Sequence, residues 1–275
     1  LRHSSAASDV YKRQQQYSKL FDDFSKSIKQ GKTYQIKIAQ TYSKKGKVNA
    51  VQLFWKLMKM NESPESFLIR DKNYSIISCS PETLILKKKN LIKTKPIAGT
   101  LRKTKSLNKN KALSFFRKNE KETKEHNMIV DMERNDLSKI CKTGSVKIEK
   151  LKRVEEYRDL FHYVSTIKGL IKKNITNHEI ISSLMPGGSV IGCPKISTIQ
   201  LLNNKEKNDR NIYTGSFGVI HSNGDMRFNI MIRTLLNFKN NINLSVASGV
   251  ILGSTAKKEY NENYIKAKSL LELFH

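Results

Sequence analysis

Residues 212–236 read "IYTGSFGVIHSNGDMRFNIMIRTLL", in which two runs rich in β-branched and aromatic residues flank the dipeptide Asn223-Gly224. Asn-Gly tolerates the positive φ angles of tight hairpin turns, so this arrangement predicts an antiparallel hairpin with strands over 212–222 and 226–236. A third run of the same kind, "INLSVASGVI" at 242–251, predicts a neighbouring strand. We therefore expect antiparallel pairing to dominate this end of the chain.

The rest of the chain alternates between short strand-like pieces and longer amphipathic segments. The strand-like pieces are "YQIKIAQTY" at 34–42, "SFLIR" at 66–70, "YSIISCS" at 74–80 and "TLILKKKNLIKTKPIAGT" at 83–100. Helices are expected from Tyr17 to Gly31, over 105–140 and from about Lys257, because apolar residues recur there at helical spacing. This order predicts one α+β domain with large mixed or antiparallel β-sheets flanked by helices.

Composition limits the class of protein. The chain has 275 residues with 38% hydrophobic content, and its apolar runs are too short to span a bilayer. Its three cysteines are widely spaced without a CxxC pair, which favours a reducing, cytoplasmic location and argues against disulfides or a zinc site. Residues 1–14 have neither a signal-peptide core nor a periodic face, so we expect a non-native or disordered leader before a folded domain at 15–275.

The net charge of +27 has two interpretations. Basic residues attract polyanions, but nucleic-acid readers usually concentrate arginine and aromatic residues in one stripe, and this chain has no such cluster. Its lysines are scattered among many Asn and Ile residues, which share A/T-rich codons. We therefore expect no specific nucleic-acid partner and no membrane partner.

A glycine-rich turn, "PGGSVIGCPK" at 186–195, precedes a helix-like run. Backbone N–H groups at the start of a helix lack internal partners and favour anions. Gly187 and Gly192 have the spacing of a P-loop, but Cys193 and Pro194 stand where that motif requires Lys and Ser/Thr. The turn therefore predicts a site for an anion other than a nucleotide phosphate.

Several charged residues are candidates for chemistry. Glu125 lies in "KEHNMIVDMERND" at 124–136, and Glu259 and Glu262 share one face of the last helix. Each carboxylate is either an ordinary surface charge or, when brought together with another, a ligand for a hard cation such as Mg²⁺. Lys266 follows Glu262 by one helical turn, where an ordinary ion pair is the simpler interpretation.

Two other residues lie in apolar surroundings. His162 in "FHYVST" is either a structural histidine or the best general acid–base candidate in the chain. Arg233 in "IMIRT" suggests a buried carboxylate partner, internal or from a ligand, because arginine binds carboxylates with two hydrogen bonds and stays charged.

Taken together, these segments resemble the chorismate-utilising enzymes: anthranilate synthase component I, aminodeoxychorismate synthase component I and the isochorismate and salicylate synthases. The resemblance runs from about Gly31 to the C-terminus. The matching motifs occur in the family's order: "GKTYQIKIAQ", "SCSPE", "KPIAGT", "KEHNMIVDMERNDL", "HYVST", "PGGSVIGCPK", "YTGSFGVI", "FNIMIRT", "ASGVILGS" and "KEYNENYIKA".

The resemblance implies a role for each candidate residue. Arg233 and Tyr213 would hold the enolpyruvyl carboxylate of chorismate, while Lys266 and the backbone at Gly249 would meet the ring carboxylate with Mg²⁺. Glu125 and Glu262, with Glu259 nearby, would bind the metal. His162 would lie beside the ring as a proton-transfer or orienting group, and Thr100 of "KPIAGT" is a further catalytic candidate. The glycine-rich turn would complete the substrate site through Gly188, Ser189 and Gly192.

The resemblance also indicates whether water or ammonia attacks chorismate. Water-adding members carry a lysine base at the position of Gln35, and glutamine cannot activate water, whereas ammonia is already a nucleophile. Amination is therefore expected, with ammonia supplied by a glutamine amidotransferase partner subunit.

Different residues favour different branches of the aminating enzymes. The segments "TYQIKIAQ", "PGGS" and "FNIMIRT" favour aminodeoxychorismate synthase and a 4-amino-4-deoxychorismate product for folate synthesis. Ala98 instead matches anthranilate synthases, because many aminodeoxychorismate synthases have a lysine nucleophile at that position. The alternatives are thus anthranilate synthase component I and, third, a catalytically degraded binding subunit. Arg227 departs from the family pattern, which often has Asp there.

Overall fold

The computed structural model describes residues 2–60, 62–157 and 160–274 of the chain. Within them the chain forms two compact units by residue contacts. Unit 1 comprises residues 1–40, 191–209 and 246–275, and unit 2 comprises residues 41–190 and 210–245. Both mix helices with antiparallel strands, which confirms the α+β class predicted from the sequence. Whether residues 15–275 act as one catalytic domain stays a prediction.

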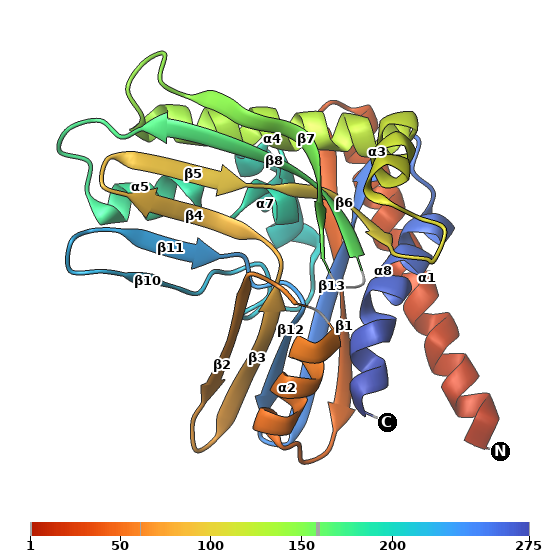
Figure 1. Cartoon of the computed structure of the whole chain (residues 1–275). Coiled ribbons are helices and arrows are strands. Elements are labelled where there is room, and N and C mark those ends of the chain that lie inside the picture. The colour runs from red at the N-terminus through yellow and green to blue at the C-terminus, as the bar shows by residue number, and fades with distance from the viewer. Residues whose placement is uncertain (1, 61, 158–159, 275) are drawn as a thin grey trace. The chain divides into compact units, whose positions relative to one another are not determined.

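Unit 1 combines the two ends of the chain. Helix α1 (Arg2–Lys29) contacts α8 (Ala256–Leu271), which continues into the short η1 (Glu272–Phe274) (Figure 1). The hydroxyl groups of Tyr17 in α1 and Ser248 lie 2.9 Å apart, and the Tyr17 ring meets the edge of Tyr260. Helix α7 (Lys195–Lys205) packs on β9 (Gly192–Cys193), and β9 pairs with the start of β1 (Gln35–Lys45).

Helix α1 begins at Arg2, although the apolar periodicity predicts a start near Tyr17. Residues 2–14, for which we expected a non-native or disordered leader, continue the helix in the structure. Whether they act as a leader stays a prediction. Leu1 lies outside the described residues. Whether the segment is native to the protein stays a prediction.

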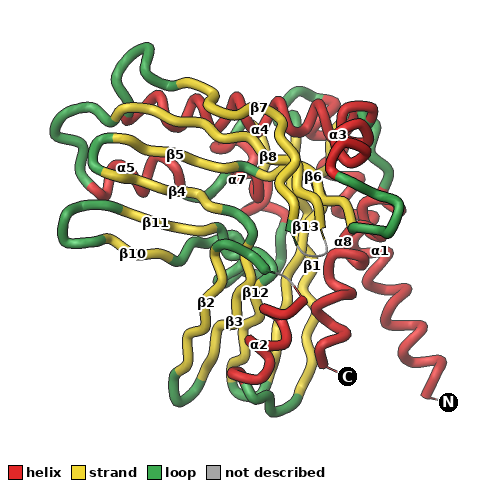
Figure 2. The backbone as a smooth tube through the Cα atoms, in the orientation of Figure 1, coloured by secondary structure: helices red, strands yellow, loops and turns green. Residues whose placement is uncertain are grey.

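Unit 2 contains a seven-stranded sheet in the order β10-β11-β4-β5-β8-β6, with β7 also paired to β8. Figure 2 shows β10, β11, β4, β5 and β8 side by side in this order. The strands are β4 (Thr83–Lys88), β5 (Leu91–Lys95), β6 (Ile97–Arg102), β7 (Lys147–Glu156), β8 (Leu160–Leu170), β10 (Gly218–Ile220) and β11 (Met226–Asn229). Each of these pairings is antiparallel.

Helices support this sheet. The long α4 (Glu120–Ile140) contacts β6 and β8, and Figure 1 shows it running along the sheet. Beside it lie α3 (Lys109–Lys118) and α5 (Asn177–Leu184), followed by the single turn α6 (Gly188–Ile191). Phe116 of α3 stacks on the buried Tyr163 of β8 with ring centroids 4.9 Å apart. A side chain at Gly99 would collide with Phe116, so glycine allows this contact.

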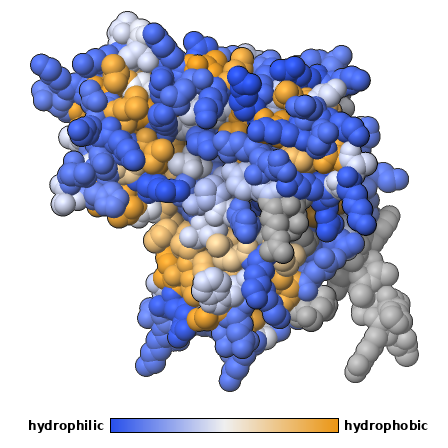
Figure 3. All heavy atoms as spheres, in the orientation of Figure 1, coloured by the Kyte–Doolittle hydropathy of each residue, from blue (hydrophilic) through white to orange (hydrophobic). Residues whose placement is uncertain are grey.

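A six-stranded sheet has the order β2-β3-β12-β13-β1-β9. In unit 2 it is formed by β2 (Glu65–Arg70), β3 (Tyr74–Ser80), β12 (Thr234–Phe238) and the first half of β13 (Asn241–Ile251), and α2 (Ala50–Met60) packs on β2 and β3. No described helix is long and apolar enough to cross a membrane. Hydrophilic side chains dominate the face shown in Figure 3, as the lysine-rich composition leads one to expect.

The hairpin at Asn223-Gly224 is confirmed, but its predicted strands are too long. Strand β10 is limited to Gly218–Ile220, and the run 226–236 is divided between β11 and β12. Residues 230–233 leave both sheets at this division, after an irregularity between Phe228 and Asn229. Residues 230 and 231 are buried although they belong to neither sheet. This is why the sequence stays apolar across the break between β11 and β12.

Candidate active site

The predicted site residues are distributed over both units. Unit 1 contains Gln35, Gly192, Gly249, Glu259, Glu262 and Lys266. Unit 2 contains Ala98, Thr100, Glu125, His162, Gly188, Ser189, Tyr213 and Arg233.

Arg233 occupies the break between β11 and β12. Its φ of 50° lies in the left-handed region, which is costly for a residue with a side chain. The backbone is held there because Arg233 O accepts from Cys79 N at 3.2 Å and Met231 exchanges hydrogen bonds with Thr214 and Gly215. The chain therefore maintains a strained conformation that fixes the direction of this arginine.

Arg233 is half-buried as a whole residue, and its Nη1 atom is buried without a hydrogen-bond partner in the described residues. Burial lowers the pKa of Arg233 to about 10, against attraction from Cys79, Glu82 and Tyr157. The group thus stays charged at neutral pH. A buried cationic N–H without a partner is costly, and a ligand carboxylate is the usual remedy.

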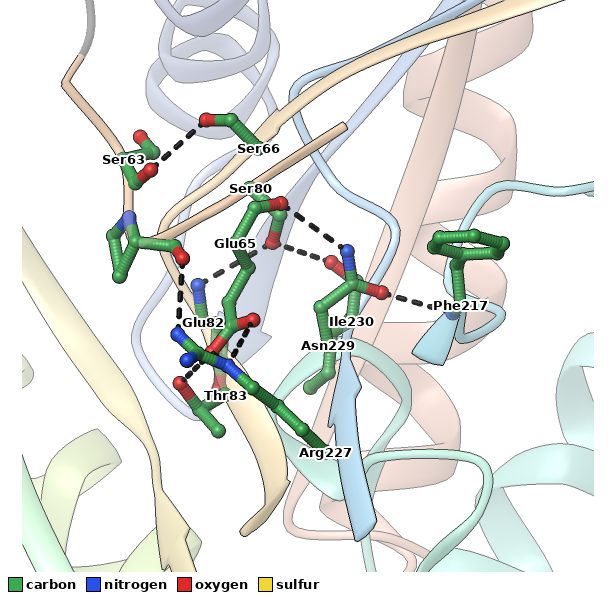
Figure 4. Close-up of polar contacts among 11 residues, drawn as sticks. Ser63, Glu65, Ser66, Ser80, Glu82, Thr83, Phe217, Arg227, Asn229 and Ile230 are labelled. Atoms are coloured by element: carbon green, nitrogen blue, oxygen red, sulfur yellow. Dashed lines mark hydrogen bonds and ion pairs between the residues drawn. The ribbon is translucent and has the colours of Figure 1, made fainter. Parts of the chain in front are cut away.

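Arg227 anchors the segment that leads to Arg233. Its Nε atom lies 3.1 and 3.0 Å from the two carboxylate oxygens of Glu65, and its Nη2 donates to Pro64 O (Figure 4). Thr83 also donates to Glu65, and Asn229 Nδ2 donates to the Glu65 backbone oxygen. The arginine that departs from the family pattern is therefore paired with an internal carboxylate.

This pairing leads to a stability prediction. Replacing Arg227 with alanine leaves the Glu65 carboxylate, whose side chain is 8% exposed, without its cation. We expect a loss of about 1–3 kcal/mol in the free energy of unfolding. Denaturant unfolding measures the change. Arg134→Ala is the control, because its pair with Asp131 is exposed and is expected to contribute below about 1 kcal/mol. Equal midpoints for both variants would contradict the anchoring role.

His162 lies in β8 directly opposite Thr100 of β6 and Glu155 of β7. Its Nδ1 atom lies 2.9 Å from the Thr100 hydroxyl, which brings two predicted site residues together. Burial lowers the pKa of His162 to about 3, and the Arg233 charge adds to this effect. A neutral imidazole is thus expected at physiological pH, suited to hydrogen bonding and to orienting a substrate rather than to carrying a charge.

Ala98 lies beside this pair at a β-bulge. The register between β6 and β8 shifts between Ile97 and Gly99, so Ala98 is the inserted residue. Bulges change the direction of a side chain and are frequent near active sites. The position is well suited to present a reactive group, but alanine provides none.

Glu125 lies on α4 and is buried. The next residue, His126, has its Nε2 atom 2.6 Å from the Ser165 hydroxyl of β8, which connects α4 to the sheet. Burial also lowers the pKa of His126, to about 4. Glu125 is thus a buried carboxylate on a helix that is fixed against the sheet.

The glycine-rich turn contributes to each unit. In unit 2, Gly188 packs against Met132, where a side chain would overlap the methionine, and the buried Ser189 hydroxyl has no hydrogen-bond partner in the described residues. In unit 1, Gly192 pairs with Ile36 and has a φ of 137°, and a side chain there would overlap the Gln35 backbone. Close packing is thus a sufficient reason for both glycines.

Gln35 is completely buried in unit 1. Neither Oε1 nor Nε2 of its amide has a hydrogen-bond partner in the described part of the chain. An amide that is buried with both ends unpaired is unusual, since buried polar groups are almost always satisfied. A polar ligand at this amide would satisfy it.

The last helix brings Lys266 and Glu262 together. Their charged atoms lie 2.7 Å apart, which is the ordinary helical pair considered from the sequence, and Lys266 Nζ also donates to Ala247 O of β13. Gly249 lies two residues further along β13. Glu259 is buried, whereas the Glu262 side chain is 40% exposed. Lys266 thus lies close to the β13 backbone, and its role toward a ring carboxylate stays a prediction.

Tyr213 is buried in a turn, with its N–H donating to Arg210 O. Among the described residues, no cluster of three or more His, Cys, Asp or Glu side chains forms a metal site.

Two residues near His162, namely Tyr157 and Glu155, were not selected from the sequence. Glu155 lies opposite His162 where β7 pairs with β8. This relation could have been predicted only if the register of the two strands had been known.

Comparison with known proteins identifies the family. A family described as chorismate binding enzyme matches residues 3–272. Aminodeoxychorismate synthase component 1 of Bacillus subtilis is 34% identical over 252 residues, covering 91% of this chain and 54% of the relative. Anthranilate synthase component 1 of Aquifex aeolicus is 33% identical over 257 residues, with 92% and 52% covered. The chain spans about half the length of these relatives.

Solved structures agree with this identification. Anthranilate synthase component I from Streptococcus pneumoniae superposes with a TM-score of 0.85 at 30% identity, covering 94% of this chain and 57% of that one. The menaquinone-specific isochorismate synthase from Escherichia coli has a TM-score of 0.84 at 20% identity, with 95% and 61% covered, and thus shares the fold. The chain belongs to the chorismate binding enzyme family, as the ordered motifs predicted.

Proposed function

We propose that this chain aminates chorismate with ammonia in a Mg²⁺-dependent reaction that gives 4-amino-4-deoxychorismate. The observation that supports it best is the set of buried, unpaired polar atoms at Gln35, Ser189 and Arg233. All three are positions that the sequence resemblance assigns to the reaction. Chorismate is a dicarboxylate with hydroxyl and ether oxygens, so it offers acceptors for the arginine and partners for the neutral groups.

The proposed roles follow from the chemistry of each side chain. Arg233, with Tyr213, binds one carboxylate of the substrate. Lys266 and the backbone near Gly249 bind the other. His162 stays neutral and orients the reacting part of the ring, supported by Thr100. Gln35 contacts the incoming nitrogen without removing a proton from water, since an amide is not a base.

We propose Glu125 and Glu262 as the residues that hold Mg²⁺, with Glu259 supporting them. Carboxylate oxygens are the ligands Mg²⁺ prefers, and the metal usually keeps several waters when only one or two carboxylates bind it. The buried Glu125 carboxylate offers oxygen ligands from a helix that is fixed against the sheet through His126 and Ser165. When bound, the metal supplies Lewis-acid stabilisation of a departing oxygen.

The proposed nitrogen source is a glutamine amidotransferase partner. Relatives named component 1 support this, since the name implies a second component. None of the three cysteines forms a disulfide among the described residues, in keeping with the reducing, cytoplasmic setting that we propose.

Anthranilate synthesis is the second candidate, and Ala98 is the observation that favours it. Without a lysine at the β6 bulge, the chain has no covalent nucleophile at this position. Ammonia would then attack the ring directly.

Product analysis decides between the two reactions. The wild-type chain is incubated with chorismate, Mg²⁺ and ammonium at alkaline pH, and products are separated by chromatography with and without added aminodeoxychorismate lyase. We expect 4-aminobenzoate only when the lyase is present, and no turnover with glutamine alone. Direct release of anthranilate and pyruvate would instead establish the second candidate, and no consumption of chorismate would contradict both.

Two variants at one position provide a matched control. Ala98→Lys adds an amine at the bulge, whereas Ala98→Met adds similar length without one. If a covalent route is accessible, only the lysine variant raises the 4-amino product relative to anthranilate.

A further inference from the structure

Tyr157 lies against the ring of His162. The two ring centroids are 5.2 Å apart and the planes meet at 68°, an edge-to-face contact. The Nδ1 atom of the same imidazole lies 2.9 Å from the Thr100 hydroxyl. The His162 ring is therefore held at its Nδ1 atom by a hydroxyl and across its plane by an aromatic ring.

The phenol of Tyr157 is itself fixed. Its hydroxyl donates to Glu155 Oε2 at 3.0 Å, and Glu155 Oε1 pairs with Lys95 Nζ at 3.0 Å. The Tyr157 backbone N–H donates to Leu160 O at the β7–β8 connection. Side-chain and backbone bonds therefore fix the tyrosine ring from both ends.

Tyr157 is also close to Arg233. The Arg233 charge acts on both Tyr157 and His162 and lowers the pKa of each. For Tyr157 this is outweighed by burial, which raises its pKa, and by Glu155. The hydroxyl thus stays protonated and donates to Glu155, so the ring beside the imidazole is neutral.

We infer that Tyr157 is a positioning residue: its ring sets the orientation of His162, and its bond to Glu155 keeps that ring in place. Imidazole rings turn about a broad, nearly two-fold torsion, so a hydrogen bond at Nδ1 alone leaves the tilt of the plane weakly defined. An edge-to-face contact biases such orientations by roughly two- to tenfold. What His162 does to a substrate rests on the proposed function, but its orientation by Tyr157 does not.

The test separates the ring from the hydroxyl. Tyr157→Ala removes both, and Tyr157→Phe keeps the ring, while Tyr74→Phe is a control at a half-buried tyrosine of β3. Side-chain ¹⁵N resonances of histidine are recorded on the ligand-free chain, and His162→Gln identifies the His162 signals among the six histidines. In parallel, kcat and KM are measured with chorismate, Mg²⁺ and ammonium.

In Tyr157→Ala we expect shifted or broadened His162 signals and a kcat lower by about tenfold, with KM changed less than about threefold. Tyr157→Phe is expected to keep the His162 signals sharp and kcat within about threefold of the wild type. If the alanine variant does not fold, Tyr157→Leu replaces it, since leucine fills space without an aromatic edge.

Unchanged His162 signals in a folded Tyr157→Ala or Tyr157→Leu variant would overturn the inference. Equal damage in Tyr157→Phe and Tyr157→Ala would also overturn it, because the hydroxyl would then be the important group. If the wild-type chain does not consume chorismate, the proposed function fails, and the resonances of the ligand-free chain still decide the role of Tyr157.

Discussion

Glu125→Ala and Glu262→Ala are each expected to lower Mg²⁺-dependent turnover of chorismate by about 1,000-fold or more. A bound divalent cation contributes several kcal/mol of charge stabilisation, and each 1.36 kcal/mol corresponds to about a tenfold change in rate. Glu125 is buried in α4, so its replacement by alanine removes oxygen ligands from a fixed position.

The measurement has two parts. Turnover is followed with increasing Mg²⁺, and metal binding is followed separately by titrating Mn²⁺ and recording the free ion by electron paramagnetic resonance. Asp131→Ala and Glu272→Ala are controls, because both carboxylates are exposed and form helical ion pairs, one in α4 and one at the end of α8. Both controls are expected to stay within about twofold of the wild type.

Glu262→Gln adds a sharper comparison. The Glu262 carboxylate pairs with Lys266 at 2.7 Å, and glutamine keeps the size of the side chain but loses its charge. If the carboxylate serves only that ion pair, Glu262→Gln leaves Mn²⁺ binding unchanged. Full activity in EDTA, or unaltered Mn²⁺ binding in both glutamate variants, would exclude the proposed metal site.

Local patterns predicted the elements of the fold that depend on neighbouring residues. The Asn223-Gly224 turn, the helices over 105–140 and the last helix are all present, because turn chemistry and helical periodicity act within a few residues. The extended 226–236 strand was wrong, since its apolar pattern is equally compatible with a strand and with buried backbone between two sheets. The early start of α1 was missed because residues 2–14 have no apolar face.

The candidate site was predictable where family motifs mark residues, and much less so where distant segments meet. Thr100 and His162 were selected separately, and the structure pairs them across β6 and β8. Arg227 was noted as a departure from the family, but its partner Glu65 is 162 residues away in sequence. Tyr157 and Glu155 were absent from the prediction, because their relation to His162 depends on strand register.

Arg233→Met is expected to lower kcat/KM for chorismate by roughly 100-fold or more, mainly through KM. A charged hydrogen-bond donor that is lost from a partly buried site costs about 2–4 kcal/mol, and arginine binds a carboxylate with two such bonds. Arg233→Lys keeps the charge but loses the planar pair of donors, so we expect it to recover only part of the affinity. Since the pKa of Arg233 is about 10, affinity for the substrate should stay constant from pH 7 to 9 and weaken as the pH approaches that value.

The inhibition constant of a non-reactive dicarboxylate analogue of chorismate measures the affinity of the site separately from the chemical step. Arg102→Met is the matched control, because Arg102 is an exposed arginine at the end of β6. Thermal unfolding checks that the left-handed conformation at position 233 is still formed, since methionine has the same backbone cost there as arginine. An Arg233→Met chain that folds normally and binds the analogue as the wild type does would show that the unpaired Nη1 atom is not the carboxylate site. The Gln35 amide and the Ser189 hydroxyl, the other buried groups without partners, would then be the next positions to test.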